Sequence, residues 1–251
     1  MKNLLFILTF LILSPTNIYA ATIGDVKVLE ASENIRYLSQ KIAKDYLYLY
    51  KYPEKRVIKK ELLSSLDKLN KDFRIIATTT KDSDTKDILE FLAYSKSQIA
   101  DMLMQKTNKD NAALMLDYSE TFLEGANSIE KAHLYAFSKE EKMIKISKEI
   151  KFLIERAAKY YMAINVGFDS PINNNQIDDS ISKLDKNLGE IGQYSYPINM
   201  KSKAEELLAL WQTDKYFFKS KELFLPNILQ SSNMYLEKLI SQISIFHSKN
   251  Q

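Results

Sequence analysis

Apolar residues recur with helical spacing along almost the whole chain, and this periodicity constrains the fold more than any other feature. Only five glycines and five prolines interrupt the 251 residues. A sequence with so few helix breakers, and rich in good helix formers such as leucine and lysine, favours long helices over a turn-rich β architecture. We therefore predict an all-α fold.

The periodic segments predict eight helices. They cover residues 25–50, 54–77, 85–105, a fourth range from about 108, a fifth to about 166, and then 176–191, 200–219 and 221–248. Segments 78–84 and 167–175, the latter containing Pro171, are predicted loops. The inward stripe of the second helix includes Val57 and Leu62, that of the third includes Phe91 and Leu92, and Trp211 is the expected core anchor of the seventh.

The boundary between the fourth and fifth helices can be interpreted in two ways. Ser138 and Glu141 have the spacing of a capping box, in which each residue satisfies the backbone N–H of the other. Either a new helix begins there, or Ser138 lies inside one long helix that joins the two halves of the chain.

The chain contains an internal repeat. A shift of 115 positions aligns residues 33–46 with 148–161 and, in the same register, 65–76 with 180–191. The matches include charged residues of the polar face, such as Lys44 with Lys159. Matches of that kind, held across an intervening loop, favour a duplication. We predict two tandem four-helix-bundle units, residues 23–137 and 138–251.

The first twenty residues have the layout of a secretory signal peptide: a basic start, an apolar run over residues 4–13, a polar break and small residues from Ala20. The apolar run of about ten residues is shorter than the roughly twenty that span a bilayer. The alternative is an uncleaved membrane anchor, because Ile18, three positions before the expected cleavage site, is larger than the small residues that usually stand there. After cleavage we expect a periplasmic or secreted chain that does not span the membrane.

Charge and composition exclude several functions. The 35 basic and 32 acidic residues are interspersed and give a net charge of +3, whereas a nucleic-acid-binding surface needs concentrated basic residues. The absence of cysteine excludes disulfides, thiolate metal sites and a lipoprotein anchor.

No catalytic pattern is present either. The only histidines, His133 and His247, are isolated on helical segments, and a single Glu130–His133 spacing does not supply the two motifs of a di-iron bundle. The sequence lacks a glycine-rich phosphate loop and a nucleophile elbow. We therefore predict no catalytic residues, no metal site and no cofactor, and a protein that is not an enzyme.

Residues 29–44 carry the most specific motif. Seven of them stand where a known sensor-family pattern expects them: Arg36, Leu38, Ser39, Gln40, Lys41, Ala43 and Lys44. On this basis the segment resembles the first helix of PilJ-type sensor domains. These are the periplasmic N-terminal modules of type IV pilus methyl-accepting chemotaxis transducers, and they are related to the sensor domains of NarX-like nitrate sensors. Glu30, Ser32, Glu33 and Tyr37 depart from the family pattern.

The resemblance implies a ligand site. In the nitrate-sensing relatives, the arginine of this motif binds the anion between two facing first helices. Carried over, that residue is Arg36, with Ser39 and Gln40 beside it and Lys151 at the matching place in the second unit. A guanidinium fork suits planar oxyanions. The alternative is a structural ion pair of Arg36 with Glu33, three residues before it on the same helix.

Two function hypotheses follow. The first is an exported, soluble sensor-like protein that binds a small anion, an envelope receptor or both, in signalling or chemotaxis. The family's transmembrane helix and signalling domain are not found in this sequence, so we expect it to act with a membrane receptor or another envelope protein. The second is a purely structural or protein-interaction helical bundle without a ligand.

Overall fold

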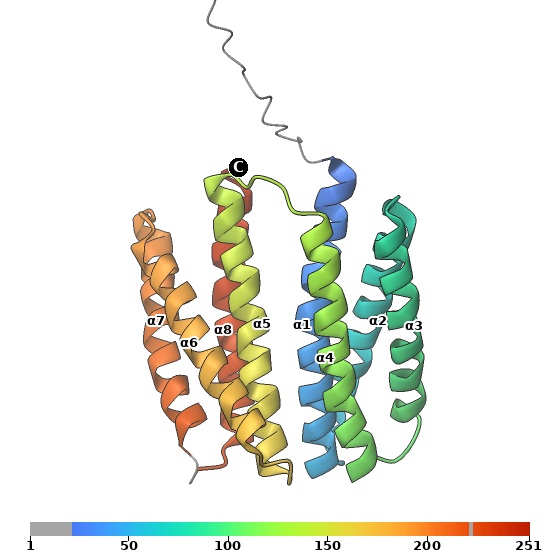
Figure 1. The fold of residues 1–251 in the computed structure, drawn as a ribbon. Helices are drawn as coiled ribbons and strands as arrows, with labels where there is room; N and C mark the ends of the chain where they lie inside the picture. The colour runs from blue at the N-terminus through green and yellow to red at the C-terminus, as the bar shows by residue number, and fades with distance from the viewer. Residues whose placement is uncertain (1–21, 221–222) are drawn as a thin grey trace, which may run out of the picture.

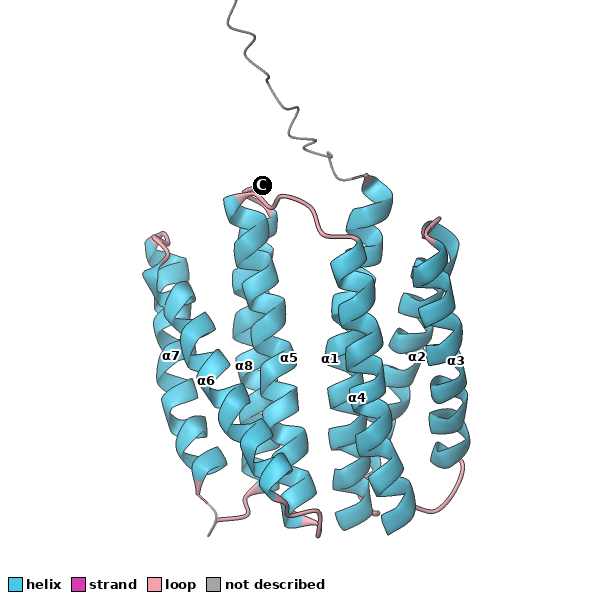
Figure 2. Ribbon diagram, viewed as in Figure 1, coloured by secondary structure: helices cyan, strands magenta, loops and turns pink. Residues whose placement is uncertain are grey.

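The computed structural model describes residues 22–220 and 223–251, so the predicted signal peptide, residues 1–20, lies outside the described residues. Within the described ranges the chain forms eight α-helices and no strand, which confirms the all-α fold (Figures 1 and 2). The helices are α1 (Ile23–Lys51), α2 (Arg56–Thr79), α3 (Ser83–Leu103), α4 (Lys109–Ala132), α5 (Lys139–Asn165), α6 (Pro171–Gln193), α7 (Ile198–Lys219) and α8 (Pro226–Ser248).

A short connection, residues 133–138, separates α4 from α5. The Ser138 hydroxyl accepts from the N–H of Glu141 at 3.1 Å, and the Glu141 carboxylate accepts from the N–H of Ser138 at 2.7 Å. This capping box begins a new helix at Lys139. The alternative of one shared long helix through Ser138 is therefore wrong.

Two helices begin at a proline, which the periodicity did not predict. Pro171, expected in a loop, is the first residue of α6, and the Ser170 hydroxyl accepts from the N–H of Asn173 in front of it. Pro226 begins α8, whereas the periodicity predicted a start at 221. Proline suits the first position of a helix because its missing N–H has no intrahelical partner there.

The helices α1 and α5 lie at the centre of the arrangement. Helix α1 packs against α2 and α4, helix α5 packs against α6 and α8, and the two pack against each other. Helices α2 and α3 lie on one outer side and α6 and α7 on the other (Figure 1). One continuous hydrophobic core extends through both halves and includes Trp211, which is buried as predicted.

Buried positions recur between the halves. In α4 and α8 the pairs Met115 and Leu229, and Phe122 and Leu236, lie 114 positions apart and are buried. Each histidine lies at the end of one half of the chain, His133 after α4 in the half formed by α1–α4 and His247 in α8 of the half formed by α5–α8. His133 is hydrogen-bonded to Asp25 of α1 and to Thr85 of α3, and His247 to Glu140 of α5 and to Tyr196, just before α7. Each histidine thus joins the end of the fourth helix of its half to the beginning of the first.

None of the helices in the described ranges is apolar enough over a sufficient length to cross a membrane.

Candidate functional site

The central position of α1 and α5 determines the chemistry between them. A helix packed on several sides buries residues all around its circumference, so charged residues of its polar stripe leave water as well. Lys44, Asp45, Glu155 and Lys159 are each 2% exposed or less. Buried charges are stable only when they are paired or hydrogen-bonded, and the interface supplies such partners.

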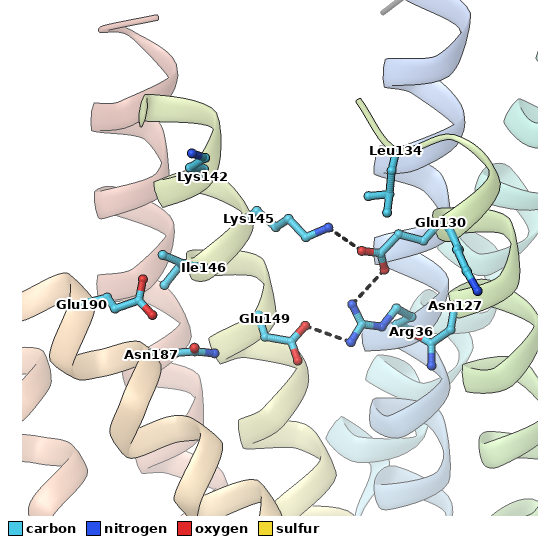
Figure 3. Close-up of a pocket in the computed structure, with 11 residues that line it drawn as sticks. Arg36, Asn127, Glu130, Leu134, Lys142, Lys145, Ile146, Glu149, Asn187 and Glu190 are labelled. Carbon is cyan, nitrogen blue, oxygen red and sulfur yellow. Dashed lines mark hydrogen bonds and ion pairs between the residues drawn. The ribbon is translucent and has the colours of Figure 1, made fainter. Parts of the chain in front are cut away.

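Arg36 bridges three helices at this interface. Its Nη1 lies 3.0 Å from Glu130 of α4, and its Nη2 lies 2.8 Å from Glu149 of α5 (Figure 3). Its guanidinium also lies 4.5 Å above the ring of Phe152, in a cation–π contact. Lys145 of α5 makes a second ion pair with Glu130, at 2.5 Å.

A cleft of about 550 Å³ opens beside Arg36, between α4 on one wall and α5 and α6 on the other. We call it the Arg36 cleft (Figure 3). Its charged lining residues are Arg36, Lys131, Lys142, Lys145, Glu130, Glu149 and Glu190. Basic side chains therefore exceed acidic ones by one, and Arg36 is the basic residue held by two carboxylates.

The other predicted site residues do not line this cleft. Ser39 donates to the backbone carbonyl of Arg36 at 2.8 Å within α1. Gln40 donates to the backbone carbonyl of Ser119 at 3.2 Å and is fully buried. Lys151 donates to the hydroxyl of Ser241 on α8 at 2.7 Å. Only Arg36 of the four predicted residues is placed at a cavity large enough for a small ligand.

The alternative ion pair of Arg36 with Glu33 is also wrong. Glu33 is paired with Lys148 of α5 at 2.7 Å. It lines a separate cavity of about 320 Å³, together with Tyr135 and Phe137. Burial raises the pKa of Glu33 in spite of the neighbouring lysine. Glu33 and Arg36 thus each pair with a residue of α5, and the expected ion pair between them within α1 is not formed.

Further along the interface lies a group of buried and partly buried ionisable residues, which we call the Lys44 cluster: Tyr37, Lys41, Lys44 and Asp45 of α1, Glu155 of α5 and Glu237 of α8. Lys44 lies 2.9 Å from Glu155 and 3.3 Å from Asp45. Tyr37 donates to Glu237 at 2.8 Å. The cluster contains three carboxyl groups and two lysines.

Burial and the neighbouring charges give the three carboxyl groups of the cluster different pKa values. Burial opposes the charge of Glu155, but Lys41 and Lys44 hold its pKa at about 2. Burial, with the nearby charge of Glu155, raises the pKa of Glu237 to about 7. Burial also raises the pKa of Asp45. Glu237 is therefore protonated below a pH of about 7, whereas Glu155 is ionised.

A second group, which we call the Lys159 cluster, joins α4 to α5: Ser119 and Glu120 of α4 with Arg156 and Lys159 of α5. Arg156 holds both oxygens of Glu120 at 2.8 Å, and Lys159 bonds Ser119 at 2.9 Å. Burial lowers the pKa of Lys159 to about 7. Burial opposes the charge of Glu120, yet Lys159 and Arg156 hold its pKa at about 2.

The carboxylates at the α1–α5 interface are not predicted by the sequence. The basic residues that pair with them do stand out, because they match between the two repeats. Lys41 with Arg156, and Lys44 with Lys159, are pairs of the 115-residue register. The periodicity predicts such charges on a polar face, whereas Lys44, Arg156 and Lys159 are buried. The carboxylates Glu120, Glu130 and Glu237 lie on other helices, and no local spacing connects them to α1 or α5.

Comparisons of this chain with protein-family models, with curated proteins and with solved structures found no match. The described residues contain no group of three or more histidine, aspartate or glutamate side chains that could hold a metal ion.

Proposed function

We propose that this chain is an exported, sensor-like helical module of the cell envelope that binds a small anion in the Arg36 cleft. The observation that carries the proposal is the position of Arg36, at an open cleft that lies between α4 and α5, one helix from each half. The resemblance of residues 29–44 to PilJ-type domains supports it, because those relatives bind an anion between two facing first helices. Here α1 and α5 are the facing helices.

The ion pairs of Arg36 suggest how binding is linked to conformation. An oxyanion that reaches the guanidinium has to replace a carboxylate, and Glu149 is the more exposed of the two, at 26% against 13% for Glu130. Its departure breaks a direct bond between α1 and α5. A ligand shifts an equilibrium only by its different affinity for the two states, and this exchange supplies such a difference. An envelope receptor would then recognise the changed α1–α5 geometry.

The test is a thermal-shift and calorimetry series on the purified protein with nitrate, nitrite and small carboxylates. We expect stabilisation by at least one anion, loss of that effect in Arg36→Ala, and tighter binding in Glu149→Gln, which removes the competing carboxylate. Arg56→Ala, at an exposed position at the beginning of α2, is the matched control. The proposal fails when neither the wild type nor Glu149→Gln responds to any anion.

A second candidate is a protein-interaction bundle without a ligand. The observation that favours it is that Glu130 and Glu149 already neutralise Arg36. Such a protein would present its outer helices to an envelope partner. Affinity capture from an envelope extract that recovers no specific partner would count against this candidate.

A further inference from the structure

Tyr46 and Tyr161 are equivalent residues of the two halves, 115 positions apart and both almost fully buried. In the second half, the chain itself satisfies the hydroxyl. Tyr161 donates to the backbone carbonyl of Leu223 at 2.7 Å and accepts from the N–H of Leu225 at 2.8 Å. Leu223 and Leu225, just before α8, thus supply both partners of the Tyr161 hydroxyl.

The first half leaves the same hydroxyl without a partner. Tyr46 is 1% exposed, and its oxygen makes no hydrogen bond within the described residues. The backbone of Asn108 and the side chain of Asn111 are near it but do not reach hydrogen-bonding geometry. A buried hydroxyl without a partner is rare in folded proteins and calls for a physical reason.

Tyr46 lines a cavity of about 200 Å³, which we call the Tyr46 cavity. Its walls are apolar, formed by Leu49, Pro53, Leu62, Leu63 and Leu103. Its polar lining comes from Lys59 and from residues 105–107, which include Lys106. Among the described residues that line it there is no carboxylate, so its charged side chains are both basic.

We propose that the Tyr46 cavity binds a short-chain carboxylate. The carboxylate accepts a hydrogen bond from Tyr46 and is attracted by Lys59 and Lys106, and the alkyl chain packs on the leucines. Apolar walls with a few converging polar groups are the usual construction of a small-molecule site. A volume of 200 Å³ corresponds to roughly six or seven water molecules, which suits a chain of about four to six carbons.

The site is distinct from the Arg36 cleft, with which it shares no lining residue. The ligand takes the place that Leu223 and Leu225 occupy around Tyr161. This accounts for the difference between the two repeated tyrosines, one satisfied by the chain and the other not.

The test is NMR titration of the isotope-labelled protein with sodium butyrate and sodium hexanoate, and with butanol and butylammonium as controls for the chain and the charge. We expect shifts confined to residues around Tyr46, Leu62 and Leu103, absent with butylammonium. Tyr46→Phe weakens binding roughly tenfold or more, because a hydrogen bond to a charged group is lost. Leu63→Phe, which fills the cavity, also weakens it.

Two further variants distinguish binding at this cavity from binding elsewhere and from a purely structural role of the hydroxyl. Tyr46→Phe is expected to melt at or above the wild-type temperature without ligand, since it removes a hydroxyl that has no partner, whereas Tyr161→Phe melts lower. Arg36→Ala keeps carboxylate binding at the Tyr46 cavity. The proposal is overturned by an absence of shifts at millimolar carboxylate, by equal affinity in Tyr46→Phe, or by loss of binding in Arg36→Ala.

Discussion

Lys44 and Glu155 form an ion pair with almost no access to water, at 2% and 1% side-chain exposure. Their attraction is strong because both groups are shielded from water, but both also lose their hydration. Such a pair adds little net stability compared with well-packed apolar residues. It is costly to break on one side only, because an unpaired charge then stays buried.

We expect Lys44→Met to lower the free energy of unfolding by about 3–5 kcal/mol. The substitution leaves three carboxyl groups, on Asp45, Glu155 and Glu237, with Lys41 as the remaining cation of the cluster. The double variant Lys44→Met, Glu155→Met removes both charges and should recover most of the loss. Urea denaturation of the two single variants and the double variant gives the coupling energy.

The matched control is the exposed pair of Lys183 with Asp179 on α6, at 2.7 Å and 58% and 48% exposure. Lys183→Met should change stability by less than about 0.5 kcal/mol, as is typical of exposed pairs. Equal effects of Lys44→Met and Lys183→Met would contradict the role assigned to the buried pair.

For single residues, the sequence motif predicts a binding role for Arg36 but does not predict the carboxylates that pair with it. Glu130 is 94 positions away and Glu149 lies on the helix of the other half, so neither follows from spacing on α1. The predicted partner Glu33 is on the same helix, yet Lys148 of α5 competes for it. A contact within one helix is lost when a neighbouring helix offers a better-placed charge.

At the scale of single helices, two glycines occupy opposite environments. A Cβ at Gly125 of α4 would lie 2.7 Å from the side chain of Leu92, which is fully buried between α3 and α4. A Cβ at Gly189 of α6 would meet no described atom within 4 Å. Gly125 therefore permits the close approach of α4 to α3, whereas Gly189 has no such role.

We expect opposite effects of the same substitution at these glycines. Gly189→Ala should raise the free energy of unfolding by about 0.5–1 kcal/mol, the gain from replacing glycine inside a helix. Gly125→Ala should lower it by about 1–3 kcal/mol, because the fully buried side chain of Leu92 has to shift to make room for the new methyl group. Chemical denaturation of both variants is the measurement. A stabilised Gly125→Ala protein would show that α3 and α4 can separate freely.

Helix identity was predictable from periodicity, whereas helix ends and faces were only partly so. The capping residues Ser138 and Glu141 were recognised, but Pro171 and Pro226 were not recognised as first residues of helices. Val57 and Phe91 were expected on the inner stripes and are 71% and 63% exposed. Their neighbours Ile58 and Leu92 are buried instead, because an adjacent position on a helix is rotated by about 100° and two apolar neighbours leave the register ambiguous.

At the scale of the whole molecule, the α1–α5 interface makes stability depend on pH. The groups facing Glu237 in the Lys44 cluster are Tyr37, Lys41, Lys44 and Glu155, and Lys151 is also close enough to interact with its charge. The two lysines of the cluster cannot balance three ionised carboxylates. Burial, with the nearby charge of Glu155, favours the protonated form of Glu237 in the folded state, and its pKa rises from 4.5 to about 7.

The sign of the effect follows from linkage. An acid whose pKa is raised by folding binds its proton more tightly in the folded state, so its stabilising contribution is present below pH 4.5 and is lost as the pH rises through 7. Asp72 and Asp214, whose pKa values burial raises to about 6, act in the same direction. Lys159, with its pKa lowered by burial to about 7, acts in the opposite direction above that pH.

Glu237→Gln isolates the contribution of one group, because the other titrating residues are common to both proteins. The amide imitates the protonated carboxyl group and can still accept from Tyr37. We expect the variant to match the wild type near pH 5 and to exceed it at pH 8 by roughly 2–3 kcal/mol, since each pKa unit corresponds to about 1.4 kcal/mol. The measurement is urea denaturation at both pH values, with the exposed Glu205→Gln as control. The difference in unfolding free energy between the wild type and Glu237→Gln could instead stay constant from pH 5 to 8. That result would mean that the proton is held by another residue. Its carrier is then Asp45, whose two carboxylate oxygens are buried and make no hydrogen bond among the described residues.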